Sequence, residues 1–118
     1  MRRILFYRTE SGFCPVQEFL ESLPNRVAQK VVWVLKLVRE LDRVPTSYLK
    51  KLRDSGDIWE VLADVGNTAC RLLGFVEEEE LIVLTNAFRK RSQKTPMKEI
   101  GVAEQRKADY ASRRKHHG

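Results

Sequence analysis

The residues of this chain whose types could do chemistry are basic. Arg71 lies between two apolar residues, Cys70 and Leu72, inside a segment that reads as a strand. Such an arginine projects from a sheet at a fixed position, where its guanidinium group can hold a phosphate through two hydrogen bonds. A second basic group, Phe-Arg-Lys-Arg-Ser-Gln-Lys-Thr-Pro at residues 88–96, directly follows an apolar stretch. Both groups indicate an anionic ligand.

Each of these groups also has a purely structural interpretation. Arg71 would form an ion pair with Glu60, which lies roughly diagonal to it across a predicted hairpin. Residues 89–94 would be a solvated basic turn. Phe88 would belong to the core rather than stack on a base. The residues themselves leave these alternatives open.

The chain lacks the residues that other common catalytic chemistries require. The chain has no glycine-rich phosphate loop and no Gly-x-Ser-x-Gly turn, and its two histidines are adjacent near the C-terminal end. The two cysteines have no partner at metal-ligand spacing. Four closely spaced acidic residues match no metal-binding loop and are interpreted as a solvated face or as ion-pair partners: Asp54, Asp57, Glu60 and Asp64. We therefore expect neither a metal ion nor a cofactor.

Length and composition are those of one basic domain. The chain has 118 residues, with 22 Lys and Arg against 16 Asp and Glu, which gives a formal charge of +6. A domain of this size buries enough surface for one core without a metal ion or disulfides. The net charge indicates an anionic partner, of which nucleic acid is a common kind. The longest apolar run, residues 31–35, is too short to cross a membrane, and no secretory signal is visible, so we expect a cytoplasmic protein.

The strands that position these groups are predicted from their apolar residues. Residues 3–7 are rich in β-favouring side chains and read as a strand. Residues 58–65 and 69–76 read as a hairpin, with Gly-Asn at its turn. Residues 81–87 form a largely apolar run that is typical of a central strand. We therefore expect a mainly antiparallel sheet.

Three helices complete the predicted fold. Pro15 begins a short helix, and an apolar stripe from Val27 to Leu41 indicates a longer one, so the two form a helical hairpin. Thr95 is the expected N-cap of a last helix that starts at Pro96 and runs towards residue 112. This helix has a weak apolar face: Met97, Ile100, Ala103, Ala108 and Ala111. The order of elements predicts an α+β domain whose helices cover one face of the sheet.

In this order, the motifs resemble those of the RelE/ParE superfamily of type II toxin–antitoxin toxins, most of all its HigB-like branch, which includes phage-derived members. The similarity includes a strand followed by Pro-x-x-x-Phe-Leu at residues 15–20, Ile-Trp-Glu-Val at residues 58–61, and Arg71. Its most specific part is residues 88–96, which are similar to Phe-x-Lys-Lys-x-x-Lys-Thr-Pro. The last helix adds further matching residues: Glu99, Ile100, Ala103, Arg106 and Tyr110.

The resemblance implies a RelE-like toxin domain over residues 1–118 that cuts mRNA, typically in the ribosomal A site. RNA supplies its own nucleophile, the 2′-OH, so cations that align the phosphate and stabilise the transition state can act without a metal ion. We assign Arg71 to the scissile phosphate. Lys90 and Lys94 would stabilise the transition state or transfer a proton, because a lysine among other cations loses its proton more readily.

The remaining site residues belong to the same hypothesis, because the basic residues fall on the predicted sheet and its edges. Tyr110 is a further candidate for catalysis if the last helix folds over the site. Glu60 would orient Arg71 or Lys90 through an ion pair. Four cations would bind the backbone of mRNA or ribosomal RNA: Lys51, Arg53, Arg89 and Arg91.

The resemblance also implies a partner and leaves other function classes open. We expect a cognate antitoxin of the helix-turn-helix, HigA-like kind, and operator DNA bound by the complex rather than by this chain alone. A ParE-like toxin would instead bind DNA gyrase and leave mRNA intact, since a shared fold does not fix function. A basic nucleic-acid-binding module would bind in a strongly salt-dependent way without arresting growth.

Overall fold

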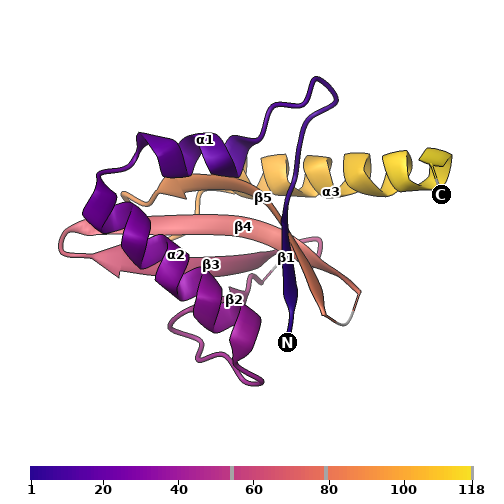
Figure 1. The fold of residues 1–118 in the computed structure, drawn as a ribbon. Coiled ribbons are helices and arrows are strands. Elements are labelled where there is room, and N and C mark those ends of the chain that lie inside the picture. Colours follow the sequence, from indigo (N-terminus) through magenta and orange to yellow (C-terminus); the bar gives the residue numbers. More distant parts are fainter. Residues whose placement is uncertain (54, 79, 118) are drawn as a thin grey trace.

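The computed structural model describes residues 1–53, 55–78 and 80–117, which form a five-stranded sheet with helices on both of its faces (Figure 1). The elements follow the chain in this order: β1 (Arg3–Phe6), α1 (Pro15–Ser22), α2 (Asn25–Glu40), β2 (Leu49–Lys51), β3 (Trp59–Val65), β4 (Thr68–Glu78), β5 (Leu81–Arg89) and α3 (Met97–His117). Every helix and strand predicted from the sequence is present, and the α+β class is confirmed. The short strand β2 was not predicted.

The sheet has the strand order β1-β5-β4-β3-β2. Strands β2 to β5 pair antiparallel as a meander, whereas β1 pairs parallel to β5. The prediction of a mainly antiparallel sheet is therefore confirmed. Strands β1 and β2 are the two edges, and β5 lies between β1 and β4, where its first six residues are buried.

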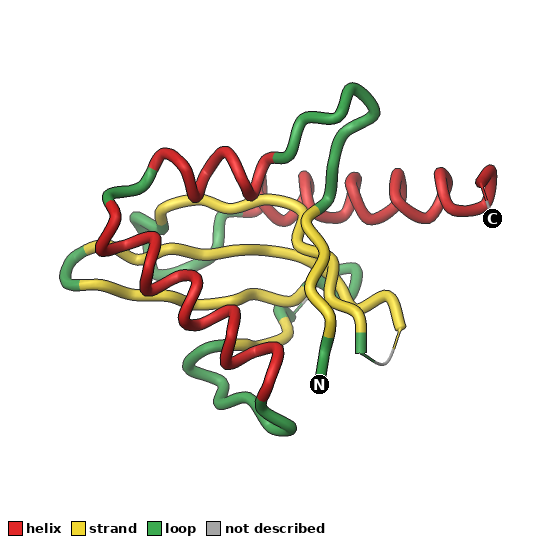
Figure 2. Tube along the Cα trace, in the orientation of Figure 1, coloured by secondary structure: helices red, strands yellow, loops and turns green. Residues whose placement is uncertain are grey.

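The two faces of the sheet are covered by different helices, as the tube view shows (Figure 2). Helices α1 and α2 bury their apolar stripes, including Val16, Val31 and Val34, against one face. Helix α3 covers the other face through Ile100 and Ala103. The prediction that helices cover only one face is wrong, because the continuous apolar run in β5 buries side chains on both sides.

Helix α3 is also held by polar contacts. Of its predicted apolar face only Ile100 and Ala103 are buried, whereas three members are exposed: Met97, Ala108 and Ala111. The Nδ2 of Asn86 donates to the carbonyl oxygen of Glu99 at 3.2 Å, and the guanidinium of Arg106 donates to a carbonyl oxygen of β5 at 2.8 Å. The start of α3 is thereby fixed to the strand that precedes it.

A close approach between β4 and β5 requires a glycine. A Cβ atom at Gly74 would lie 2.1 Å from the carbonyl oxygen of Val83 and 2.9 Å from the Cα of Leu84. The register between these strands shifts at this glycine, as it does at a β-bulge. Gly74 therefore lets β5 pack directly on β4 at this point.

The helices of the described residues include none with the length and apolar character of a membrane span. The thiol of Cys70 is buried beneath α1 and α2, and this burial raises its pKa.

Candidate active site

The sheet face beneath α3 carries most of the predicted site. The registers of β3, β4 and β5 place Glu60, Arg71 and Phe88 on this face. The amide of Lys90 donates to the carbonyl oxygen of Ala69 at 2.7 Å, which continues the β4–β5 ladder by one more pair. Lys90 is two residues from Phe88, so its side chain leaves the backbone on the same face of the sheet. The same face thus carries three predicted site residues: Glu60, Arg71 and Lys90.

Glu60 is the buried acidic centre of this face, with 0% of its surface exposed. Its Oε2 accepts a hydrogen bond of 2.5 Å from the hydroxyl of Thr95. The Nζ of Lys50 lies 3.6 Å from its Oε1, and no described residue gives that oxygen a hydrogen bond. Glu60 therefore links β2 to the loop of residues 90–96, which leads into α3 and carries Lys90 and Lys94. We call it the lysine-rich loop.

These contacts change two predictions. The ion-pair partner of Glu60 is Lys50 of β2, and the prediction of Arg71 or Lys90 as its partner is wrong. The register explains the difference, because Lys50 lies directly opposite Glu60. Thr95 is not the N-cap, because α3 begins at Met97 and its first amide hydrogen bonds go to the carbonyl oxygen of Pro96. The Thr95 hydroxyl instead donates to Glu60.

Arg71 is held by a different acid from the expected one. Its side chain is buried, and its Nη1 donates to Oδ1 of Asp64 at 2.6 Å and to the carbonyl oxygen of Cys70 at 2.9 Å. Both Glu60 and Asp64 lie diagonal to Arg71, one on each side of its cross-strand partner Leu62. The guanidinium group reaches Asp64, whose side chain is 60% exposed. A phosphate on Arg71 would therefore compete with this carboxylate.

The loop between β5 and α3 carries the second basic group. Lys90 is half-buried, whereas Arg91 and Lys94 are exposed. The hydroxyl of Ser92 donates to the carbonyl oxygen of Lys94 at 2.9 Å, and so the loop forms a local turn. Arg89 is separated from this group because it pairs with Cys70, whose side chain lies in the core beneath α1 and α2. Arg89 is therefore on the opposite face of the sheet.

Two further predicted cations lie at or after the end of β2. The Nζ of Lys51 lies 2.9 Å from Oδ1 of Asp57, and this hydrogen bond lowers the pKa of the Asp57 carboxyl. Arg53 is exposed just beyond the strand. Asp54, the first of the four acidic residues, lies outside the described residues. The other three each contact a different basic side chain: Asp57 with Lys51, Glu60 with Lys50 and Asp64 with Arg71.

Tyr110 lies away from the other candidates. Its ring packs edge-on against Phe75, with ring centroids 5.5 Å apart, and its hydroxyl accepts a hydrogen bond of 3.3 Å from Arg114. Phe75 is four residues beyond Arg71 in β4, which corresponds to roughly 13 Å along a strand. The structure thus places Tyr110 near the far end of this face.

Two residues of the site were missed from the sequence. Lys50 was not selected because β2 has only three residues, too few for strand alternation to be recognised. Asn86 was read only as part of an apolar strand, yet it is buried and its Nδ2 also donates to Oε1 of Glu99 at 3.1 Å. A polar residue inside an apolar run was the available signal, because buried amides are almost always hydrogen-bonded.

Residues 18–108 match the family described as Phage derived protein Gp49-like (DUF891). The chain belongs to this family. The Gp49-like family is a phage-derived, toxin-like family of the RelE/ParE-like toxin superfamily, so the superfamily predicted from the sequence is confirmed. A search of curated proteins found no match.

The Gp49-like match contains every candidate site residue except Tyr110. It begins within α1 and extends through β5 into α3. The match therefore includes the β3–β4 hairpin, the lysine-rich loop and the start of α3. In this Gp49-like protein, the arrangement can bind an anion at the sheet face and bring lysine side chains to it from the adjacent loop.

Proposed function

We propose that this protein is the toxin of a toxin–antitoxin pair and cleaves mRNA without a metal ion, on the translating ribosome. The observation that carries the proposal is the Glu60–Thr95 hydrogen bond beneath the basic face. It ties the loop that carries Lys90 and Lys94 to the strand beside Arg71. Membership of a toxin-like family supports the same conclusion.

The proposed reaction is an internal transfer at one phosphate of the RNA. The 2′-oxygen attacks the adjacent phosphorus, the bond to the 5′-oxygen of the next nucleotide breaks, and a 2′,3′-cyclic phosphate and a 5′-hydroxyl are formed. One group takes the 2′-OH proton and another gives a proton to the leaving oxygen. Arg71 would bind the phosphate after displacing Asp64, and Lys90 and Lys94 would stabilise the charge and move protons. Glu60 would act as a positioning residue for the loop.

Cations around the site would hold the rest of the RNA. Arg53 and Arg91 are exposed in the loops that follow β2 and β5, and Lys51 is exposed at the end of β2. Arg89 would contact a different part of the RNA or the ribosome, because it lies on the other face of the sheet. Tyr110 would act only on a substrate that extends along β4 as far as Phe75.

The partner of this toxin would be an antitoxin encoded with it. We propose a helix-turn-helix, HigA-like antitoxin, and binding of operator DNA by the complex rather than by the toxin alone. Specific operator binding by the isolated toxin would contradict this part of the proposal.

The function is tested by measuring mRNA cleavage in a translating extract. The variant Lys90→Ala/Lys94→Ala is expected to lose cleavage by about 100-fold or more, as when a general acid or base is removed. Both side chains lie at least partly in solvent, so the fold should survive. Lys36→Ala/Arg39→Ala is the matched control, because it removes the same charge from exposed positions of α2 and should cleave normally.

Other outcomes would decide against the proposal. Full cleavage by the loop variant would refute the assigned residues. Intact mRNA with DNA-damage signalling on expression would identify a gyrase-binding toxin instead. Salt-sensitive RNA binding without cleavage or growth arrest would identify a binding module. The same mRNA without ribosomes tests ribosome dependence, because efficient cleavage of free RNA would contradict it.

A further inference from the structure

The edge strand β1 leaves backbone hydrogen-bonding groups free. The amides of Arg3 and Tyr7 donate to carbonyl oxygens of Glu80 and Leu84, on the β5 side, at 2.6 and 2.9 Å. In a parallel ladder successive residues alternate in direction, so the amide and carbonyl groups of Ile4 and Phe6 point away from β5. No other strand of the described sheet lies on that side. Such an edge can accept a further strand.

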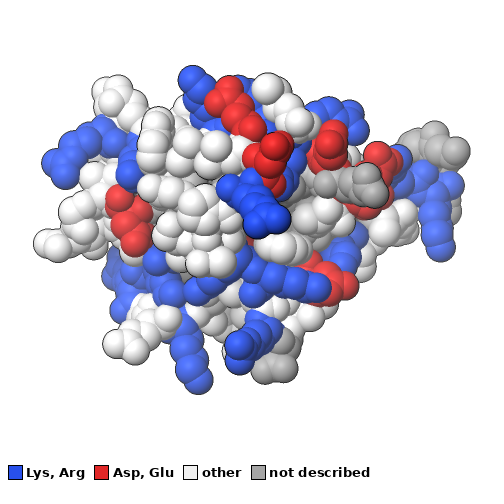
Figure 3. Space-filling view, turned by 90° about the horizontal axis from the view of Figure 1, so that it is seen from below, with Lys and Arg blue, Asp and Glu red and all other residues white. Residues whose placement is uncertain are grey.

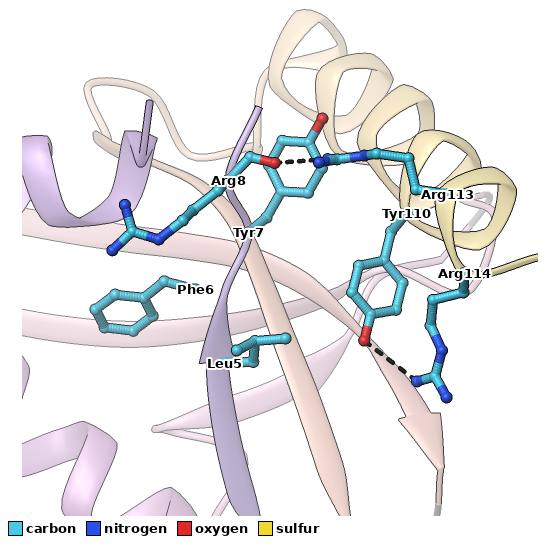
Figure 4. Close-up of a pocket in the computed structure, with 7 residues that line it drawn as sticks. All are labelled: Leu5, Phe6, Tyr7, Arg8, Tyr110, Arg113 and Arg114. Carbon is cyan, nitrogen blue, oxygen red and sulfur yellow. Dashed lines mark hydrogen bonds between the residues drawn. The ribbon is translucent and has the colours of Figure 1, made fainter. Parts of the chain in front are cut away.

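A groove lies on each side of this edge. On the α3 side, a groove of about 380 Å³ is lined by Leu5, Tyr7 and Tyr110 together with basic residues (Figure 4). On the α2 side, a groove of about 660 Å³ is lined by Ile4, Val32 and other residues. Leu5 is 43% exposed in the first groove, and Val32 is 56% exposed in the second. Apolar surface is therefore available on both faces of the same strand.

The residues that line the two grooves include several cations and no acid, although Arg39, Arg113 and Arg114 pair with acids outside the lining. The first groove is bordered by Arg8, Arg113 and Arg114. The second is bordered by four cations: Arg2, Arg3, Lys36 and Arg39. Arg3, Arg8 and Lys36 have no ion-pair partner among the described residues. In the view from below, Lys and Arg side chains are spread among uncharged residues and fewer Asp and Glu side chains (Figure 3).

We propose that β1 is a docking edge for an extended acidic segment of the antitoxin, which adds a sixth strand to the sheet. Alternate side chains of a strand point to opposite faces, so an apolar centre would fill both grooves at once. Acidic flanks would meet the basic rims. Backbone hydrogen bonds to Ile4 and Phe6 would hold the segment in place. A second copy of this chain fits poorly, because it would bring a rim of the same charge against this one.

The proposal names a partner for the proposed toxin and in that respect rests on the proposed function. Its structural part can be tested without cleavage, using the peptide Asp-Glu-Val-Leu-Ile-Val-Glu-Asp as the probe. Two control peptides and one oligoribonucleotide separate the contributions. A central proline in place of leucine removes a backbone donor, lysine flanks reverse the charge, and a single-stranded oligoribonucleotide tests RNA as the occupant.

Calorimetry and amide exchange give the readout. The acidic peptide is expected to bind at least about tenfold more tightly than the proline or lysine peptides, because each lacks a backbone or charge contact. Binding should slow hydrogen exchange at the amides of Ile4 and Phe6 and leave that of Leu5 unchanged, since Leu5 already faces β5. Equal binding of the proline peptide, protection elsewhere, or binding of only the oligoribonucleotide at β1 would overturn the proposal.

A pair of variants tests the edge from the side of the protein. Ile4→Pro removes an outward amide but no hydrogen bond to β5, a change that edge strands tolerate. Ile4→Ala removes the same side chain and keeps the amide. Peptide binding should be lost in Ile4→Pro and retained in Ile4→Ala, while both cleave mRNA like the wild type. If the wild-type protein did not cleave mRNA, the proposed function would be refuted, but the result of the peptide experiment would still hold.

Discussion

Replacing Thr95 by valine should destabilise the protein and release the lysine-rich loop. Glu60 is completely buried, and the Thr95 hydroxyl donates the one hydrogen bond that the described residues give to it. The nearby Nζ of Lys50 is 3.6 Å away on a side chain that is 42% exposed. Valine keeps the shape of threonine but removes the donor. A hydrogen bond to a charged group contributes roughly 1.5–3 kcal/mol, and we expect a loss of that size.

The loss is large enough to measure by thermal denaturation. For a chain of 118 residues, the entropy of unfolding is about 0.25 kcal/mol/K, so Tm should fall by about 6–12 °C. Circular dichroism at pH 7 follows the transition. Thr95→Ser is the matched control, because it keeps the hydroxyl and should melt close to the wild type. Thr46→Val, at an exposed position, tests the effect of the substitution itself.

The same variant links stability to function. If the hydrogen bond positions the loop, Thr95→Val should also cleave mRNA more slowly below its melting transition, whereas Thr95→Ser should not. A Thr95→Val protein that melts within about 2 °C of the wild type would refute the reasoning, because a buried carboxylate would then tolerate the loss of its hydrogen bond.

Two further predictions concern other parts of the fold. Gly74→Ala should lower the free energy of unfolding by roughly 1–3 kcal/mol or more in urea titrations, because its Cβ would lie 2.1 Å from the carbonyl oxygen of Val83; an unchanged midpoint would contradict this. The Tyr7 hydroxyl donates to Asp109 at 2.5 Å, and this bond, aided by Arg113, lowers the pKa of the Asp109 carboxyl. The resulting stabilisation is present above about pH 4 and lost as pH falls through the folded pKa. Tyr7→Phe should therefore be less stable than the wild type at pH 7, by a difference that shrinks near pH 3, and a pH-independent difference would argue against this link.

The regular elements could be predicted because their patterns are local. The stripe in α2 and the turn between β3 and β4 depend on residues close together in the sequence. Strand β2 has no such pattern, since its three residues are ordered by pairing with β3. The buried run in β5 requires apolar cover on both faces of the sheet, and α3 supplies that cover on the face opposite α1 and α2.

The partners of the site residues were less predictable than their positions. Strand alternation puts Glu60 and Asp64 on the same face as Arg71 and diagonal to it, so either could be its ion-pair partner. Only the direction of the guanidinium group selects Asp64. Thr95 has the residue type of an N-cap, yet α3 begins two residues later and the Thr95 hydroxyl donates to a buried carboxylate across the sheet. Such choices depend on long-range contacts that a single sequence does not display.

The positive charges of the site and of the β1 edge are neutralised differently, and this has a consequence for inhibition. On the site face, Arg71 is paired with Asp64, so an incoming phosphate must displace an internal acid. Beside β1, Arg39, Arg113 and Arg114 are also paired with acids. Arg3, Arg8 and Lys36 have no ion-pair partner among the described residues, so an acidic strand can meet these three without displacing an acid. With strands about 4.8 Å apart, β1 and β4 are separated by roughly 10 Å, so a strand added at β1 does not cover Arg71. If the proposed antitoxin is anchored there, its anchoring strand alone should leave cleavage intact, and inhibition would require the rest of its chain, which would cover Arg71 or keep the proposed toxin out of the ribosome.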